Sequence, residues 1–548
     1  MADFKKIRFI NKDSTTTEVM CKDEQARNDL LLKANITDLV PIKNSIKDLE
    51  AQTTFKRYGV SGIGLQSSTL TRIYDSIGMT ATVGVDDEDV TNDFDNAAPF
   101  MRRKCVGTWL LEDQRAIFNI NAYYGDDNYT EDGSMGDYVA VECPLCYYYM
   151  NNGQLIISAH KYPDYHPFDI FCRNHDENDL LPYVYLPAYP LALKDGKAVS
   201  LPGLENENGA YKTLVDYART YDNGSLGNKA MLLPAAVNFY EYALFTVEFA
   251  TQNCQSIMAG VSNYRSNGDD RVTFVDATHV LTSNYQAGRK VGYRISIMPT
   301  SVSDVHDGRY KATHVITSVT RCDENGNPSD SGTHQLLELE DLERNYWTYD
   351  TTGSTQYKIG GRPFLTGTTK NIKASSGSVS NNTDGYNSMR YRWRENIYGN
   401  QYWTSMDLFG IRQGTGDDDY YIEWYYLKNP EEYTPSSTSN PNINDLNTSL
   451  FKKLDITTLH DNYVNGYIKS KKYSKDYPDI WIPYETTGGS SSTYYCDNAS
   501  LVNSAVVRSV RFGGAWSHGA FDGLSFFSGH NAPSFASALY GGALYFVQ

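Results

Sequence analysis

The stretch that decides the fold runs from Pro234 to Met258 and reads "PAAVNFYEYALFTVEFATQNCQSIM". A helix drawn through it is apolar on nearly every side, so we expect this helix to be buried all round. Glu248 falls inside the helix, and a buried carboxylate requires a partner for its charge. The sequence therefore predicts one buried helix, within a region whose other elements are strands.

Outside this helix, the sequence from about Tyr58 to Ser262 is typical of strands joined by Gly and Asp turns. Residues 107–150 are typical and read "GTWLLEDQRAIFNINAYYGDDNYTEDGSMGDYVAVECPLCYYYM". Val139, Val141 and Cys143 alternate there with the residues between them, a period of two that predicts a half-buried strand.

After the helix, residues from about Asp269 to Leu342 form a smaller block of alternating strands with the turn "DENGNPSDSG" (323–332). We expect an inserted β module at residues 266–350. Residues 351–390 are rich in Gly, Ser, Thr and Asn, and an aromatic region with "DDDYYIEWYYLKNPEEY" (417–433) follows them.

The first 56 residues differ from the rest, because "DEQARNDLLLKANITDLVPIKNSIKDLEAQTT" (23–54) is charged and lacks Gly. A seam with alternating three- and four-residue spacing predicts coiled-coil packing. Its members are Leu32, Asn35, Leu39, Ile42, Ile46 and Leu49. Pro41 interrupts the seam, so we expect two short helices. They form either an oligomeric stalk or a helical pair packed on its own domain.

The composition excludes some classes of function. The net charge of −17 disfavours nucleic acid as a partner, because its phosphates attract clustered Lys and Arg. The start "MADFKKIRFINKDS" has no apolar signal region and no long apolar run follows, so we expect synthesis in the cytoplasm and no membrane insertion. Eight Cys in 548 residues indicate reduced thiols, not a disulfide scaffold.

Two groups of residues could hold a metal. Cys143 and Cys146 of "CPLC" are candidates for a zinc site together with His160, His166, Cys172 and His175. Only one closely spaced ligand pair is present, and buried thiols are the alternative. The stretch "SVSNNTDGYNS" (378–388) and the acidic run 417–419 could hold a structural calcium or be solvated loops. We find no phosphate loop and no nucleophile elbow, so we expect no enzyme and no cofactor.

The C-terminal stretch has an unusual composition. Residues 512–546 read "FGGAWSHGAFDGLSFFSGHNAPSFASALYGGALYF" and include one charged residue, Asp522. Lys, Glu, Gln, Met, Thr, Ile and Val are absent, while Gly, Ser, Ala and aromatic residues alternate. A core strand favours β-branched residues and a disordered tail lacks aromatic ones, so neither description fits.

Three stretches of the last third resemble one family. "MRYRWRENIYGNQYW" (389–403) resembles the E-N-x-x-G-N-x-W segment of the formylglycine-generating-enzyme branch of the C-type-lectin-like fold. "VVRSVRFGGAWSHG" (506–519) resembles its R-x-x-R-G-G-x-W signature, and "IWIPYETTGGSSSTYYCD" (480–497) is similar to the segment before the terminal hairpins in phage members. The matching residues are Glu395, Asn396, Gly399, Asn400, Arg508, Gly513, Gly514 and Trp516. Trp403 stands one position late, and Phe512 replaces the usual Arg.

The resemblance extends back through "LFTVEFATQNCQSIMAG" (244–260) and "YYGDDNYTEDGSMGDYVAVECP" (123–144) to phage tail proteins of this type, and so covers about residues 57–548. It implies an α+β, C-type-lectin-like fold with two parts, 57–265 and 351–548, separated by the β module. Enzymes of the family use paired cysteines late in the chain, and no Cys follows Cys496. The resemblance therefore does not imply a retained oxidase activity.

In phages with diversity-generating retroelements, the last segment of such a protein is rewritten at adenines, so that AAC codons become NNC codons. NNC codons cannot encode Lys, Glu, Gln, Met or Trp, and residues 512–546 include only Trp516 of these five. The resemblance implies that the exchanged, ligand-binding positions are Ser517, His518, Phe521, Ser525, Phe527, Ser528, His530, Asn531, Phe535, Ser537, Leu539 and Tyr540. Trp516 and the glycines at 513, 514, 519, 523, 541 and 542 are expected to be the fixed frame.

The function implied by the resemblance is adhesion to a host. We expect a receptor-binding protein in the virion, at the tip of a phage tail or tail fibre, with a bacterial protein or glycan as receptor. Residues 1–56 are expected to bind other tail proteins and to form a homotrimer. The alternatives are a structural tail component without receptor binding and a formylglycine-generating-type oxidase.

Overall fold

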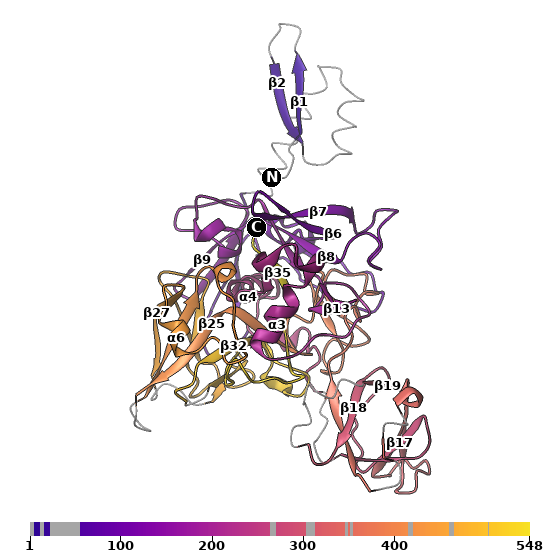
Figure 1. The fold of residues 1–548 in the computed structure, drawn as a ribbon. Coiled ribbons are helices and arrows are strands. Elements are labelled where there is room, and N and C mark those ends of the chain that lie inside the picture. Colours follow the sequence, from indigo (N-terminus) through magenta and orange to yellow (C-terminus); the bar gives the residue numbers. More distant parts are fainter. Residues whose placement is uncertain are drawn as a thin grey trace.

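The computed structural model describes residues 55–263, 270–302, 313–345, 349–350, 354–414, 420–459, 465–501 and 504–548, and the backbone of 5–10 and 16–21. In these ranges the protein is mostly β with few helices. The longest helix, α4 (Ala235–Phe249), lies in the middle of the body (Figure 1). It contacts strands of two different sheets, so the prediction of a helix within a strand-rich region is confirmed.

Helix α4 is buried at every residue except Asn238 and Phe249. The carboxylate of Glu248 lies 2.7 Å from the guanidinium of Arg392 and also accepts hydrogen bonds from Asn92 and Tyr391. Two turns earlier, Glu241 binds two buried arginines, Arg394 at 2.6 Å and Arg102 at 3.0 Å. The partner that Glu248 required is thus Arg392, which lies in the first family-like motif at residues 389–403.

Helix α4 packs between two sheets. A five-stranded sheet has the order β11-β9-β10-β3-β4, with strands at Arg57–Ser61 (β3), Thr71–Tyr74 (β4), Tyr147–Asn151 (β9), Gln154–Ser158 (β10) and His166–Pro167 (β11). A larger sheet has the order β27-β26-β25-β32-β33-β31-β28, with β34 paired to β25. Its strands are Tyr402–Gln413 (β25), Tyr421–Leu427 (β26), Phe451–Leu459 (β27), Gly466–Tyr467 (β28), Asn498–Leu501 (β31), Arg508–Gly513 (β32), Gly523–Gly529 (β33) and Tyr540–Gly541 (β34).

A four-stranded sheet, β12-β8-β6-β7, separates two cores. Its strands are Arg103–Glu112 (β6), Arg115–Tyr123 (β7), Tyr138–Pro144 (β8) and Tyr183–Pro187 (β12). The prediction that the Val139 strand is half-buried is wrong, because β8 is buried on both faces. Val139 and Val141 lie in the core around α4, whereas Tyr138 and Ala140 lie in a second core.

The second core is closed by the last strand of the chain. Strand β35 (Leu544–Phe546) pairs with β15 (Ala230–Leu232), and helix α3 (Tyr211–Ala218) packs beside β15. The ring of Phe546 stacks on Trp109 at 4.5 Å between ring centroids and also contacts Tyr138 and Tyr221. The C-terminal residues are therefore an interior part of the body.

Shorter strands complete the body. A hairpin joins Ala192–Lys194 (β13) and Lys197–Val199 (β14), another joins Ser470–Tyr473 (β29) and Trp481–Glu485 (β30), and a small sheet has the order β24-β23-β22-β5. That sheet consists of Gly84–Val85 (β5), Gly377–Ser378 (β22), Met389–Tyr391 (β23) and Arg394–Glu395 (β24). Short helices lie at Leu342–Asn345 (α5) and Ile443–Leu446 (α6).

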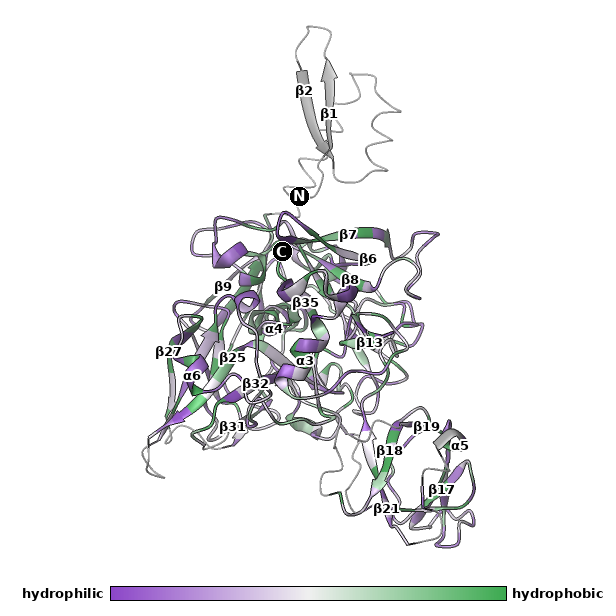
Figure 2. Ribbon diagram, viewed as in Figure 1, coloured by the Kyte–Doolittle hydropathy of each residue, from purple (hydrophilic) through white to green (hydrophobic). Residues whose placement is uncertain are grey.

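The inserted β module is a closed barrel of the order β16-β17-β20-β19-β18-β21, which lies to one side of the body (Figure 1). Its strands are Arg271–Phe274 (β16), His279–Thr282 (β17), Arg294–Pro299 (β18), His314–Cys322 (β19), His334–Leu339 (β20) and Tyr357–Arg362 (β21). Strand β18 is hydrophobic and buried (Figure 2). The predicted end at residue 350 is too early, since β21 closes the barrel by pairing with β16 and β18.

At the N-terminus, β1 (Lys5–Ile10) and β2 (Thr16–Cys21) form an antiparallel hairpin. The prediction of a helical segment is therefore wrong for these residues, whose β-branched and aromatic side chains favour strands. The predicted seam at residues 32–49 lies outside the described residues. Among the helices that the structure describes, none is both long and apolar enough to cross a membrane.

Candidate binding surface

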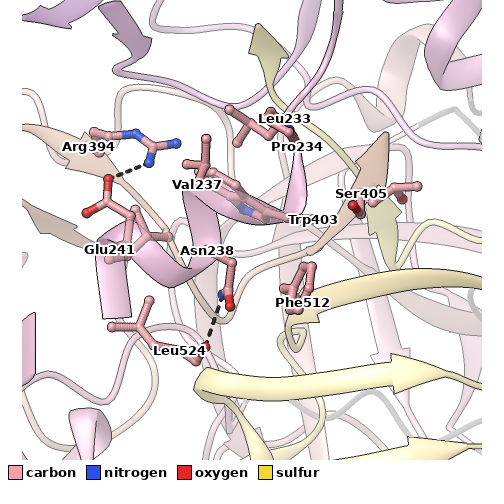
Figure 3. Close-up of a pocket in the computed structure, with 12 residues that line it drawn as sticks. Leu233, Pro234, Val237, Asn238, Glu241, Arg394, Trp403, Ser405, Phe512 and Leu524 are labelled. Atoms are coloured by element: carbon pink, nitrogen blue, oxygen red, sulfur yellow. Dashed lines mark hydrogen bonds and ion pairs between the residues drawn. The ribbon is translucent and has the colours of Figure 1, made fainter. Parts of the chain in front are cut away.

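The C-terminal segment is anchored on helix α4. The side chain of Asn238 donates a hydrogen bond to the carbonyl of Leu524 at 3.0 Å (Figure 3). The indole N–H of Trp481 donates to Asn238. Beside them lies a cavity of about 20 Å³ that Arg394 and Phe512 help to line. This volume has room for about one water molecule, so the cavity is an interior packing gap and not a ligand site.

Three residues predicted to form the frame of the segment have constrained positions in the structure. Trp516 is buried, and Gly513 and Gly514 have φ values of +86° and +80°, which favour glycine. A Cβ on Gly514 would lie 1.7 Å from the Oδ1 atom of Asp522. That oxygen accepts a hydrogen bond from the backbone of Ala515, and burial raises the pKa of Asp522 to about 6. Asp522, the one charged residue of the segment, is thus a buried structural residue.

The two family-like motifs bond directly to each other. The backbone N–H of Gly399 donates to the carbonyl of Gly513 at 3.0 Å, and that of Trp516 donates to the carbonyl of Asn400 at 3.4 Å. The Glu395 carboxylate accepts hydrogen bonds from the backbone of Gly367 and Thr369. These motif residues therefore hold the segment in place.

Seven of the twelve predicted binding residues reach the surface. Phe521, His530 and Phe535 are exposed, and Ser517, His518, Asn531 and Leu539 are partly exposed. We call these seven residues the terminal surface. None of them is Lys, Arg, Asp or Glu, so this surface offers mainly ring faces and uncharged hydrogen-bonding groups.

The prediction that Phe527 is exposed is wrong. Strand β33 is an inner strand of its sheet, between β32 and β31, and all of its residues are buried. The ring of Phe527 contacts Trp424, Trp481 and Phe512 at 5.3 to 5.6 Å between centroids. This side chain belongs to the core.

Tyr540, which we also expected to be exposed, is buried. Its ring lies 4.0 Å from the guanidinium carbon of Arg511 and 5.2 Å from the ring of Tyr402, and its hydroxyl bonds to Asn531. The parallel pairing of β34 with β25 draws this residue inward. Tyr540 is therefore a buried residue that packs against Asn531 and Phe535 of the terminal surface.

Three predicted serines are buried as well, so the expectation that they contact a ligand is wrong. Ser525 accepts a hydrogen bond from Lys471, and its backbone N–H donates to Asp497. Ser528 lies in strand β33, and the Ser537 carbonyl accepts from the backbone of Tyr540. Small hydroxyl side chains fit such interior positions when their hydrogen bonds are satisfied.

Ring contacts connect much of the terminal surface. His518 contacts Tyr402 at 5.1 Å, Tyr402 contacts Tyr540, and Tyr540 contacts Phe535 at 5.7 Å. Phe521 follows His518 within a short turn and packs on Tyr467 at 5.4 Å. The structure thus connects His518 to Phe535 through Tyr402 and Tyr540, while Phe521 packs separately on Tyr467.

His530 lies at the far end of strand β33, where Ser500 Oγ is 3.4 Å from its ring nitrogen. Burial, together with the charges of Arg508 and Arg511, lowers the pKa of His530. The ring is therefore neutral at pH 7. It can offer a donor or an acceptor to a ligand, but no charge.

The sequence did not reveal the supporting tyrosines. Tyr402 lies within a quoted motif and Tyr467 within no motif, and both are distant in sequence from the segment they support. The only signal was the abundance of Tyr, which suits recognition surfaces and strands equally. Long-range strand pairing decides which tyrosines approach the segment.

The candidate metal ligands are dispersed. Cys143 and Cys146 are buried, and burial raises the pKa of Cys143 to about 11. His166 binds Glu177 and His175 binds Asp169. In the described part of the chain, no three His, Cys, Asp or Glu side chains are grouped so that they could hold a metal ion. In the other candidate stretch Asp384 bonds to Lys290, and residues 417–419 lie outside the described residues.

No protein-family model matches the chain, and no curated protein matches it. The β-rich architecture is compatible with the expected fold class.

Proposed function

We propose that this protein is the host-adhesion protein of a bacteriophage tail, built on a C-type-lectin-like scaffold that displays the terminal surface. One observation carries the proposal. Of the residues expected to vary, seven reach the surface, while the expected frame of Trp516 and Gly514 is internal and tightly constrained. A fixed frame with exchangeable exposed residues can change its ligand with little cost in stability.

The chemistry of the terminal surface supports binding. Phe521 and Phe535 each expose 43% of their area. Exposed aromatic rings on a rigid frame supply much of the free energy at recognition surfaces. The receptor is a protein or glycan of the bacterial surface, which such rings can contact through their faces.

The proposal also assigns a place in the virion. The protein lies at the tip of the tail or tail fibre, residues 1–56 bind other tail proteins, and three copies assemble. Several weak sites on one particle bind strongly together, since each later contact is intramolecular.

The test is adsorption to host cells by protein with Phe521→Ser and Phe535→Ser. We expect at least tenfold weaker binding with only a small change in melting temperature, because both rings are exposed and outside the cores. The matched control is Leu65→Ser, which removes an exposed apolar side chain outside the segment and should bind as the parent does.

Equal binding by the double variant and the parent would contradict a role for the terminal surface. If the purified protein binds no host cell and antibodies label the tail tube, the protein is a structural component. Oxygen consumption with a cysteine peptide would instead favour the oxidase.

A further inference from the structure

Strand β32 has two arginines, Arg508 and Arg511, that pair with no carboxylate of the described residues. Arg511 is buried, and its guanidinium lies over the ring of Tyr540 at 4.0 Å and donates to the carbonyl of Ser509 at 3.4 Å. Arg508 is partly exposed, and burial alone lowers its pKa. Of its three guanidinium nitrogens only Nε is buried without a partner, so the two terminal nitrogens can reach a ligand.

The arginines around helix α4 differ from this pair. There Arg392 pairs with Glu248, and Arg102 and Arg394 both pair with Glu241. A buried charge without such a partner is costly. Solvent and salt screen its field less than that of an exposed charge, so it acts on groups at the surface nearby.

The charges of Arg508 and Arg511 act on one end of the terminal surface. Both lower the pKa of the exposed His530, and no carboxylate of the described residues opposes them there. The next residue, Asn531, is held beside the two arginines, because its carbonyl accepts from the backbone of Ser509 at 3.2 Å. This end of the surface therefore has a positive potential, although its own side chains are uncharged.

We propose that this end of the terminal surface binds an oxyanion of the receptor, a carboxylate or a phosphate, through the guanidinium of Arg508. A guanidinium binds both groups with two parallel N–H donors. His530 and Asn531 add uncharged donors beside it, and the charge of Arg511 strengthens the attraction. Arg508 is not among the positions expected to vary, so this contact persists while the residues around it are exchanged. The inference rests on the proposed adhesion function and narrows its receptor to one with acidic groups.

The test is calorimetric titration of the whole protein with phenyl phosphate, benzoate and benzyl alcohol, which share a ring and differ in charge. We expect at least one of the two anions to bind at least tenfold more tightly than the alcohol, and the tighter anion shows whether the receptor group is a phosphate or a carboxylate. Arg508→Gln removes the charge and should weaken the binding of that anion at least tenfold. The matched control is Arg115→Gln, at an exposed position of another sheet, which should bind as the parent does.

A crystal of the parent protein soaked in the tighter anion gives a readout that does not depend on the folding of any variant. We expect the anion within hydrogen-bond distance of a terminal nitrogen of Arg508. Benzyl alcohol that binds as tightly as both anions, a soaked crystal without the anion at Arg508, or unchanged anion binding by the folded Arg508→Gln variant would overturn the proposal.

Adsorption to host cells separates this inference from the adhesion function itself. Arg508→Gln should adsorb at least tenfold more weakly than the parent. If it adsorbs as the parent does while the variant with Phe521→Ser and Phe535→Ser does not, the adhesion function stands and the oxyanion contact is refuted. If the protein binds the anion through Arg508 but binds no host cell, the oxyanion site stands and the adhesion function is refuted.

Discussion

Trp516 and Phe521 are five positions apart in the same segment but have opposite environments, since Trp516 is buried and Phe521 is 43% exposed. We expect Trp516→Ser to lower the free energy of unfolding by about 3 to 5 kcal/mol, the usual cost of deleting a large buried ring. Phe521→Ser should lower it by only about 1 kcal/mol, since this partly exposed ring loses its contact with Tyr467. Chemical denaturation of both variants measures the difference, and equal losses would mean that Phe521 belongs to the core.

His175 should make stability depend on pH. Burial opposes its charged form, but the hydrogen bond and charge of Asp169 and the Lys428 carbonyl outweigh this and raise the pKa. A raised folded-state pKa means that the contribution is fully present below the unfolded pKa, about 6.5, and is lost as pH rises through the folded pKa.

We therefore expect the parent to exceed His175→Asn in melting temperature at pH 6, by a margin that shrinks as the pH rises to 9. Asn tolerates the left-handed backbone at this position, where φ is +61°. A margin independent of pH would show that the charge of His175 contributes nothing.

At the scale of elements, the barrel should be removable. The chain enters the barrel after Val261 and leaves it before Phe364, and both residues bond to Asn400. The Asn400 backbone N–H donates to the carbonyl of Val261, and the Phe364 backbone N–H donates to the side chain of Asn400. Replacing residues 264–362 by a short Gly-Ser linker should leave the two cores around α4 and β35 folded, since they include no barrel residue. It also uncovers Tyr402, Trp516 and Tyr540, which share a third core with the barrel strands. Circular dichroism and a cooperative melting transition check this; a molten or insoluble product would show that the barrel is required.

The elements also show what local sequence can predict. The helix within Pro234–Met258 was predictable because its residues are almost continuously apolar, and the inserted strands because their apolar alternation is local. Phe521 and Phe527 could not be distinguished, since the codon restriction applies to both and only contacts with rings from distant segments, such as Trp424 and Trp481, bury Phe527. The sequence likewise predicted that Glu248 needs a partner. It could not show that the partner is Arg392, which lies far along the chain.

For the whole molecule, the proposal predicts that deleting residues 1–55 yields a folded monomer. The cores described above consist of later residues, so the body should keep its melting temperature. Light scattering coupled to gel filtration gives the mass of the truncated and full-length proteins. A truncated protein that stays in the same oligomer as the parent would place the assembly contacts elsewhere.

The position of Phe546 in the second core also affects biosynthesis. Because β35 must pair with β15 and the ring of Phe546 must stack on Trp109, the body cannot complete its folding until the ribosome has translated residues 544–546. A nonsense codon anywhere in residues 512–546 removes this strand, leaving an incomplete core exposed to cellular proteases. If this segment is rewritten as proposed, the NNC codons cannot include a stop codon, since no stop codon ends in C, so the rewriting itself keeps β35 in the chain.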